Sequence, residues 1–118
     1  VSLRPVFRSP AYAAVDWLEE ALEETGYTEN FKGSIDPEDW TEPPPDPEAM
    51  ALCVSDQAEP GDIVVMHIGP DSTPEALVLL LADLRGKGYS FLTLEQMLLY
   101  GDPVYEHGWP SKQCGDYY

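Results

Sequence analysis

The sequence predicts an α/β fold in which parallel β-strands alternate with α-helices. Short apolar segments and amphipathic helical segments follow one another along the 118 residues, separated by turns rich in glycine and proline. The order strand then helix occurs four times, which favours parallel strands joined by crossover helices. Four such units are too few to close a barrel, which needs about eight strands. The pattern therefore predicts either a small open sheet or half of a barrel.

The first predicted unit is a strand over residues 3–7 and a helix over residues 13–25. Pro5 removes a backbone donor, so the strand is expected at a sheet edge or at its own start. Leucine and alanine recur at helical spacing in residues 13–25, and four glutamates cover the opposite face. Gly26 is expected to end this helix.

The second predicted unit is a weak strand over residues 28–35 and a short helix over residues 47–56. Asp46 is a good N-cap for this helix, and Pro47 suits its first position. The proline-rich stretch of residues 36–46 cannot form a regular helix or sheet and is predicted to be a loop.

The last two predicted units begin with the strands at residues 63–67 and 89–92. Residues 63–67 are apolar and rich in β-branched side chains, which is typical of a buried parallel strand. Thr73 is expected to be the N-cap of the helix that follows, and Thr93 to cap a last short helix. The expected buried stripe of the Thr73 helix is Leu77, Leu80, Leu81 and Leu84. Residues 101–118 lack periodicity and are predicted to form a polar, aromatic-rich tail.

The charge of the chain excludes some classes of partner. Six basic and 22 acidic residues give a formal net charge of −16, which opposes binding to nucleic acid or to anionic lipid. Such a surface either serves solubility or favours a neutral or cationic substrate. No apolar stretch approaches the roughly 18–20 residues that a membrane-spanning helix needs. Cys53 and Cys114 are compatible with a disulfide or with two reduced thiols.

Polar side chains follow three of the predicted strands, where parallel α/β folds bind their ligands. Arg8 follows the first strand, Asp36, Asp39 and Trp40 follow the second, and His67 ends the third. His67 is suited to proton transfer, and a neighbouring carboxylate would fix its tautomer. Each residue has a plainer alternative role. His67 would then bind a backbone carbonyl, the aspartates would cap turns, Arg8 would lie on the surface, and Trp40 would lie in the core.

No metal site can be assembled from the sequence of this chain. It contains no His-x-x-x-His pair and no Cys/His cluster with the spacing of metal ligands. Gly-x-Ser-x-Gly and phosphate-binding glycine-rich loops are also absent. The chain enters an apolar segment almost at once, which leads us to expect a fragment of a longer protein.

Several segments resemble the polysaccharide deacetylase family, also called the NodB-homology or carbohydrate esterase family 4 domain. In chain order they are Phe7-Arg8-Ser9-Pro10, Ser34-Ile35-Asp36-Pro37-Glu38-Asp39-Trp40, Gly61-Asp62-Ile63-Val64-Val65-Met66-His67, Thr73-Pro74-Glu75-Ala76-Leu77 and Gly88-Tyr89-Ser90-Phe91-Leu92-Thr93-Leu94. They resemble that family's Arg-Pro-Pro, Asp-x-x-Asp-Trp and Gly-x-Ile-x-Leu-x-His segments, and the helix and strand that close its domain. The resemblance implies that residues 1–100 are the second half of a distorted (β/α) barrel.

The same resemblance implies roles for individual residues. His67 would be the general acid that protonates the departing amine, with Asp39 tuning it and Asp36 beside it in the catalytic group. Trp40 would line the acetyl pocket, and Arg8 would orient a catalytic base outside this chain. Tyr12 and Val65 are further candidates for contact with substrate. A divalent metal, zinc by preference, would be held by residues outside this chain, and the location implied is extracellular.

The sequence leaves three hypotheses about function. The first is part of a metal-dependent hydrolase that removes N-acetyl or O-acetyl groups from a polysaccharide, completed by an N-terminal half or a second chain. The second is a non-catalytic module for carbohydrate binding or assembly, which the altered segment Arg8-Ser9-Pro10-Ala11-Tyr12 favours. Val65 and Ile68 also depart from the family pattern. The third is a free-standing α/β protein unrelated to deacetylases.

Overall fold

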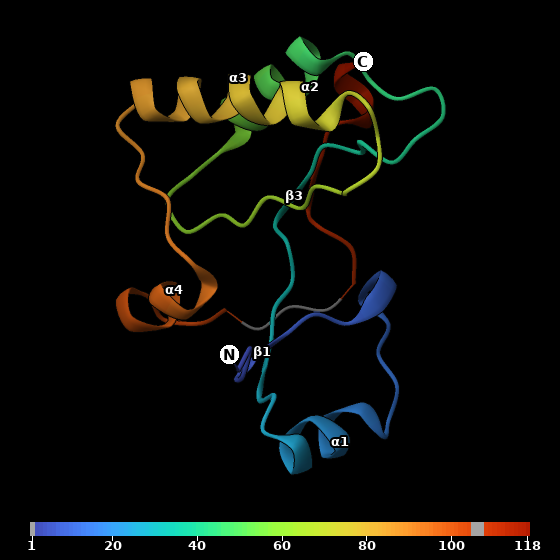
Figure 1. Cartoon of the computed structure of the whole chain (residues 1–118), viewed down its shortest axis with the longest axis vertical. Helices are drawn as coiled ribbons and strands as arrows, with labels where there is room; N and C mark the ends of the chain where they lie inside the picture. Colours follow the sequence, from blue (N-terminus) through green and yellow to red (C-terminus); the bar gives the residue numbers. More distant parts are fainter. Residues whose placement is uncertain (1, 105–107) are drawn as a thin grey trace. The chain divides into compact units, whose positions relative to one another are not determined.

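The computed structural model describes residues 2–104 and 108–118, and it divides the chain into two compact units (Figure 1). The first unit contains residues 1–32 and 92–109, and the second contains residues 33–91 and 110–118. The chain therefore crosses between the two units three times, after Lys32, after Phe91 and after Trp109. Each unit has its own small parallel sheet and its own helices.

The first unit is built from β1 (Val6–Phe7), α1 (Leu18–Thr25), β2 (Glu29–Asn30) and α4 (Leu94–Tyr100). β1 and β2 pair in parallel, with Val6 opposite Glu29. Gly26 ends α1 in the left-handed conformation (φ 81°), as expected. Thr93 caps α4 in a reciprocal capping box with Gln96, which confirms the helix start predicted there.

The second unit is built from β3 (Ile35–Asp36), α2 (Pro47–Gln57), α3 (Thr73–Gly86) and β4 (Lys112–Gln113). β3 pairs in parallel with β4 on one side and bridges to Val64 on the other. The two helices pack together, α2 behind α3 in the view of Figure 1. Between them and the sheet lies the core, formed by Ile35, Ala51, Cys53, Val54, Leu80, Leu84 and Cys114.

Three predicted elements of the N-terminal part are shorter than expected. The strand at residues 3–7 is reduced to β1, and the helix at 13–25 begins only at Leu18. Ala11 and Tyr12 have positive φ values of 51° and 53°, and Ala13 has extended backbone, so the helix does not begin at residue 13. The strand at 28–35 is divided into β2 and β3, because the chain leaves the first unit after Lys32.

The strand predicted at residues 63–67 is reduced to a single bridge at Val64. Ile63 and Val65 bond to the backbone of Ser34 and Ile35, as neighbouring strands do. The amide of His67 then bonds to the carboxylate of Asp39 instead of a backbone carbonyl. The ladder ends there because a side chain has replaced the next strand partner.

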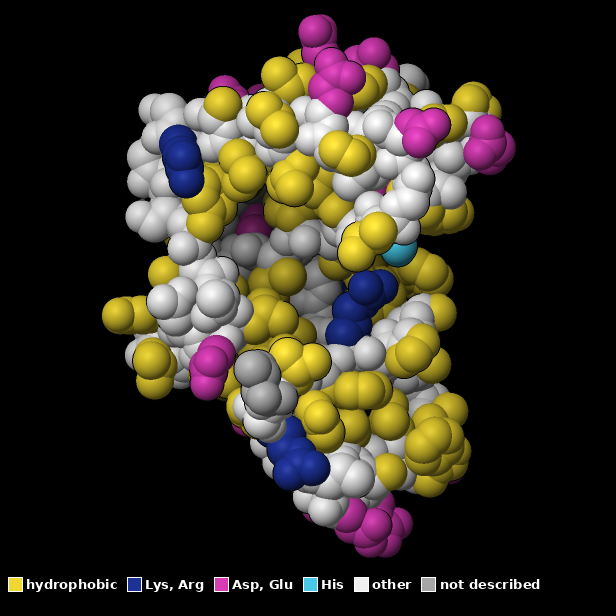
Figure 2. Space-filling view, viewed as in Figure 1, with side chains coloured by type: hydrophobic (Ala, Val, Ile, Leu, Met, Phe, Trp, Pro, Cys, Tyr) yellow, Lys and Arg dark blue, Asp and Glu magenta, His cyan; other side chains and the backbone are white. Residues whose placement is uncertain are grey.

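The strand predicted at residues 89–92 is not formed, whereas the helices predicted before it are found as α2 and α3. Asp46 caps α2 with its carboxylate, and Pro47 is the first residue of this helix, as expected. The α3 helix buries Leu80 and Leu84, but Leu77 is 41% exposed because Thr73 and Ala76 occupy the inner face. Hydrophobic side chains gather over α3 on the face shown in Figure 2. Val78 and Leu79 of this helix are exposed.

The parallel pairings agree with the alternation of strands and helices in the sequence. Sheets of two short strands neither establish nor contradict a partial barrel, which stays a prediction. Residues 110–118, within the predicted tail, contribute β4 and Cys114 to the second unit.

Candidate functional site

The candidate site lies in the second unit, in the loop that follows β3. Asp36 Oδ1 accepts a hydrogen bond from the Glu38 amide at 2.8 Å, which tightens the turn. Glu38 has a φ of 56°, in the left-handed region that non-glycine residues seldom occupy. This turn places the next side chain, Asp39, inside the unit, where it is fully buried. Strained backbone of this kind often accompanies functional residues.

Asp39 is buried, but its carboxylate accepts hydrogen bonds from three donors. Oδ2 accepts the His67 amide at 2.7 Å and the Thr73 hydroxyl at 2.7 Å. Oδ1 lies 2.8 Å from His67 Nδ1. A carboxylate can be held in the interior when donors replace the water that it loses. The contacts also join the β3 loop, the end of the predicted 63–67 strand and the start of α3.

His67 is held so that one edge of its ring remains accessible. Its Nδ1 faces Asp39, and 37% of its side chain is exposed. A carboxylate at Nδ1 favours the tautomer that carries its proton on this nitrogen. The other nitrogen, Nε2, is then the atom available to accept or donate a proton. The sequence predicted both residues, and the structure brings them together.

Thr73 is a member of this cluster that the sequence analysis did not identify as a site residue. We expected Thr73 to cap α3, but the N-cap is Ser72, and the Thr73 hydroxyl donates to Asp39 instead. Thr73 is buried, with 7% of its surface exposed. No local signal could reveal this role, because Thr73 and Asp39 are 34 residues apart in the chain.

The other candidates in the second unit have different surroundings. Asp36 caps the Glu38 turn, which is the plainer of the two roles expected for it. Trp40 is 52% exposed, so it is not a core residue. Val65 is buried, and its amide bonds to Ile35. The roles of all three in catalysis or substrate binding stay predictions.

Arg8 and Tyr12 lie in the first unit. The Arg8 guanidinium lies over the Tyr12 ring, 5.0 Å from its centre. Tyr12 also meets Trp109 edge to face, with ring centres 5.5 Å apart. The prediction that Arg8 lies with Asp39 and His67 at the same end of the predicted parallel strands stays a prediction.

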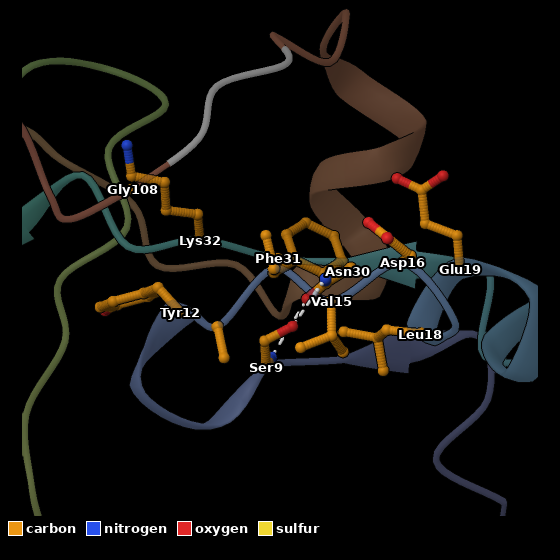
Figure 3. Close-up of a pocket in the computed structure, with 12 residues that line it drawn as sticks. Ser9, Tyr12, Val15, Asp16, Leu18, Glu19, Asn30, Phe31, Lys32 and Gly108 are labelled. Carbon is orange, nitrogen blue, oxygen red and sulfur yellow. Dashed lines mark hydrogen bonds between the residues drawn. The ribbon is translucent and has the colours of Figure 1, made fainter.

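Tyr12 lines an open cavity of about 380 Å³ within the first unit (Figure 3). Ser9 and Asn30 bind each other across one side of this cavity, through Ser9 N to Asn30 Oδ1 and Asn30 Nδ2 to Ser9 Oγ. Val15, Leu18 and Phe31 supply apolar surface. The volume is within the range of small-molecule sites.

A strap, defined here as residues 110–118, packs against the site loop of the second unit. Its β4 segment pairs with β3, and the Cys114 amide bonds to the Asp36 carbonyl at 3.1 Å. Cys114 is joined to Cys53 of α2 by a disulfide, which resolves the two possibilities left open by the sequence. The Tyr118 hydroxyl donates to the Pro37 carbonyl at 2.6 Å.

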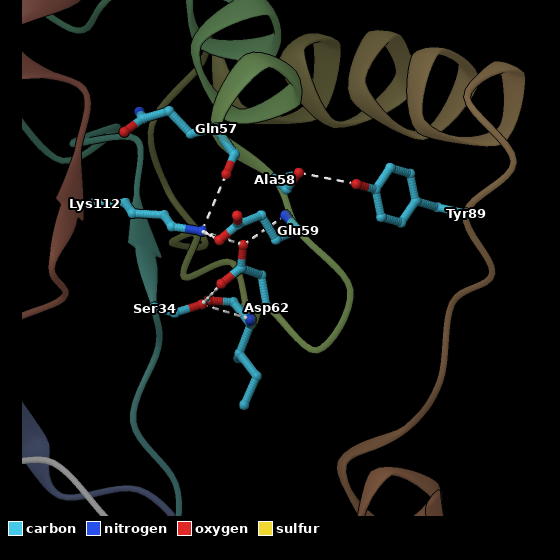
Figure 4. Close-up of polar contacts among 8 residues, drawn as sticks. Ser34, Gln57, Ala58, Glu59, Asp62, Tyr89 and Lys112 are labelled. Atoms are coloured by element: carbon cyan, nitrogen blue, oxygen red, sulfur yellow. Dashed lines mark hydrogen bonds and ion pairs between the residues drawn. The ribbon is translucent and has the colours of Figure 1, made fainter. Parts of the chain in front are cut away.

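Lys112 fixes the beginning of the strap through a group of polar contacts (Figure 4). Its Nζ lies 2.7 Å from Asp62 Oδ2 and 2.8 Å from Glu59 Oε2, and it also donates to the Gln57 carbonyl. Partial burial acts to raise the pKa of Asp62, but hydrogen bonds from Lys112, the Ser34 hydroxyl and the Glu59 amide bring this pKa below its usual value. The same hydrogen bonds to Asp62 and Glu59 raise the pKa of Lys112.

The described residues contain no group of three or more histidine, cysteine, aspartate or glutamate side chains able to hold a metal ion. The described helices include none with the length and apolar character needed to cross a bilayer.

Comparison with curated proteins matches this chain to a peptidoglycan-N-acetylglucosamine deacetylase of Bacillus cereus. The two sequences are 33% identical over 99 residues, a region that covers 80% of this chain and 46% of the relative. The chain thus spans less than half the length of that protein. No protein-family model and no solved structure matches the chain. The identity supports a distant relationship between this chain and the polysaccharide deacetylases.

Proposed function

We propose that this chain is part of a carbohydrate deacetylase that removes acetyl groups from a polysaccharide, with His67 as its general acid. The observation that carries the proposal is the Asp39–His67 pair, in which a fully buried carboxylate binds Nδ1 of a partly exposed imidazole. The related Bacillus cereus deacetylase supports the class of reaction. A buried carboxylate that orients a histidine is a common arrangement in proton transfer.

In the proposed reaction, water attacks the carbonyl carbon of an acetamido group and the carbon–nitrogen bond breaks. The departing nitrogen takes a proton from His67 Nε2, so that a free amine leaves with acetate as the other product. Asp39 holds the ring through Nδ1 and stabilises the protonated imidazole before the transfer. An O-acetyl group would follow the same course, with an alcohol as the leaving group.

The proposal requires polypeptide beyond this chain. The chain matches 46% of the relative, and no metal site is found within the residues that the structure describes. The described residues do not fit a metal centre, so we place the divalent metal, zinc by preference, on the complementary half or a second chain. A metal would supply an activated water and polarise the acetyl carbonyl.

Substrate contact is proposed for the aromatic residues Trp40 and Tyr12, and a role beside the catalytic base is proposed for Arg8. Trp40, which follows Asp39 in the loop, is 52% exposed and offers an apolar wall for an acetyl methyl group. Tyr12 lines the cavity of the first unit, and Arg8 lies over its ring. Arg8 would orient the catalytic base of the complementary half. The net charge of −16 suits a neutral or cationic sugar polymer.

An extracellular or other oxidising compartment is the proposed location. The Cys53–Cys114 disulfide supports it, since disulfides persist where thiols are not kept reduced.

The proposal is tested by complementation. The chain is mixed with the portion of the Bacillus cereus protein outside the matched region, zinc is added, and acetate release from an N-acetylglucosamine polymer is measured. We expect release from the mixture, and a loss of about 10²- to 10⁴-fold in the His67→Gln variant, because the leaving amine then lacks a proton donor.

Glu48→Gln, at an exposed position in the first turn of α2, is the matched control and should leave acetate release unchanged. Equal release by wild type and His67→Gln would exclude the general-acid role. No release from a correctly folded mixture would contradict the deacetylase proposal.

The second candidate function is a non-catalytic carbohydrate-binding module. It is favoured by the cavity in the first unit. Ser9, which departs from the family pattern, is buried and bound to Asn30 at the edge of a cavity with aromatic and apolar walls. This candidate predicts binding of sugar oligomers by the chain with no dependence on His67. Isothermal titration of the wild type and of His67→Gln with the same oligomers distinguishes the two functions.

A further inference from the structure

The loop that carries Asp39 is braced from outside by the strap. Three strap residues donate hydrogen bonds to backbone carbonyls of β3, of its neighbouring residue Ser34 and of the loop that follows. Lys112 N donates to the Ser34 carbonyl at 3.1 Å, Cys114 N to the Asp36 carbonyl at 3.1 Å, and Tyr118 Oη to the Pro37 carbonyl at 2.6 Å. The last of these contacts lies two residues before Asp39.

The turn between these contacts and Asp39 is the one with left-handed backbone at Glu38. A residue other than glycine in this conformation needs surrounding structure to hold it, at a cost of about 1 kcal/mol or more. Gly115 of the strap lies directly against this turn, since a β-carbon built on Gly115 would be 2.5 Å from Glu38 Oε2. The strap therefore supports the strained residue on one side, while Asp36 supports it from within the loop.

The strap is itself anchored to the packed part of the second unit. The Cys53–Cys114 disulfide joins it to α2, and Cys114 is fully buried. Lys112 adds ionic contacts with Asp62 and Glu59. The strap is thus fixed to the packed part of the unit and can transmit that rigidity to the loop.

Tyr118 is the strap residue whose side chain reaches the loop nearest to Asp39. Partial burial raises the pKa of Tyr118, and the carboxylates of Glu38, Asp39 and Asp36 raise it further. Its hydroxyl therefore keeps its proton at neutral pH and remains a donor to Pro37.

We propose that Tyr118 is a positioning residue for the candidate site, and that its hydroxyl bond to the Pro37 carbonyl holds Asp39 in register with His67. Tyr118 acts through the loop and has no contact with substrate in this proposal. Its relevance to catalysis rests on the proposed deacetylase function, whereas the positioning itself is measured on the chain without substrate.

The test is amide hydrogen exchange of the complete chain by NMR, read at the His67 amide that donates to Asp39 Oδ2. In Tyr118→Phe we expect this amide to exchange about 3- to 10-fold faster, as the loss of one partly buried hydrogen bond predicts. The Val65 amide, which bonds to the Ile35 carbonyl, reports on the same unit away from the loop and should change less. The imidazole ¹⁵N shifts of His67 should move toward a mixture of the two tautomers.

Tyr117→Phe is the matched control, since Tyr117 is the neighbouring phenol in the short helix Gly115–Tyr117 and is as exposed as Tyr118, at 49% against 48%. This variant should leave the exchange and the ¹⁵N shifts of His67 at their wild-type values. The proposal is overturned if His67 is unchanged in Tyr118→Phe. It is also overturned if Val65 and His67 accelerate equally, because that result means a general loss of stability. An inactive complemented enzyme with the expected exchange would reject the deacetylase function and leave the positioning role intact.

Discussion

The two units of this chain differ in how much of their surface they bury. In the second unit ten hydrophobic and four polar or charged residues are buried, and a disulfide links α2 to the strap. Among the described residues of the first unit, Ser9 and Leu22 are the buried ones. The first unit instead has an open cavity and two short paired strands.

This difference explains why the candidate proton-transfer pair has a fixed geometry. Asp39 is fully buried and needs hydrogen-bond donors in place of water, and the packed second unit supplies three. In the first unit, the Arg8 guanidinium stacks on the Tyr12 ring in a region with few buried residues. A small unit with little buried area gains little stability from burial and is expected to open more readily.

Removal of the disulfide should have the largest effect on this contrast. Cys53 and Cys114 are 61 residues apart, and the chain-entropy model assigns about 4 kcal/mol to closing a loop of this length. The double variant Cys53→Ala, Cys114→Ala should lose about 2–5 kcal/mol of stability in urea unfolding. Hydrogen exchange should show the loss in the second unit. Equal losses in α1 and α2 would mean that the units unfold together.

A core truncation in the first unit should have the next largest effect. Leu22 is the buried hydrophobic residue of α1, with 9% of its surface exposed. Leu22→Ala should destabilise the first unit by about 2–3 kcal/mol, at the lower end for buried leucine because its surroundings are loosely packed. Exchange should accelerate in α1 and remain unchanged in α2. The control is Leu52→Ala, at a 58% exposed position on α2, which should change neither.

The smallest effect is expected from the ionic contacts of Lys112. The lowered pKa of Asp62 means that the unfolded chain binds its proton more tightly, so this contribution is present above about pH 4 and lost as pH falls further. The raised pKa of Lys112 gives a contribution that is present below its usual value of 10.5 and lost at higher pH. Lys112→Met should therefore lower stability by up to about 1 kcal/mol, mainly between these limits.

Urea unfolding of wild type and Lys112→Met at several pH values measures this difference. A difference that is constant from pH 3 to pH 7 would show that the Asp62 contact is not the cause. Lys32→Met, a lysine of the first unit, provides a comparison for the loss of a positive charge from this acidic chain.

Local sequence signals predicted the helices well and the strands poorly. Asp46 with Pro47, and Thr93 with Gln96, specify helix starts through contacts within four residues, and both starts are found as expected. The strands depend on partners far along the chain. At His67 the expected ladder ends because the Asp39 carboxylate binds the amide, and a single sequence segment carries no sign of that.

The sequence by itself determined the positions of α2, α3 and α4 and identified Asp39 and His67 as candidates, because caps, helical periodicity and residue chemistry are local properties. Only the tertiary structure decided that Thr73 completes the Asp39 cluster, that Cys53 pairs with Cys114, and that Tyr118 supports the loop. These contacts join residues 34, 61 and 81 positions apart. They form because burial leaves each polar group or thiol with a specific neighbour, which depends on how the whole unit packs.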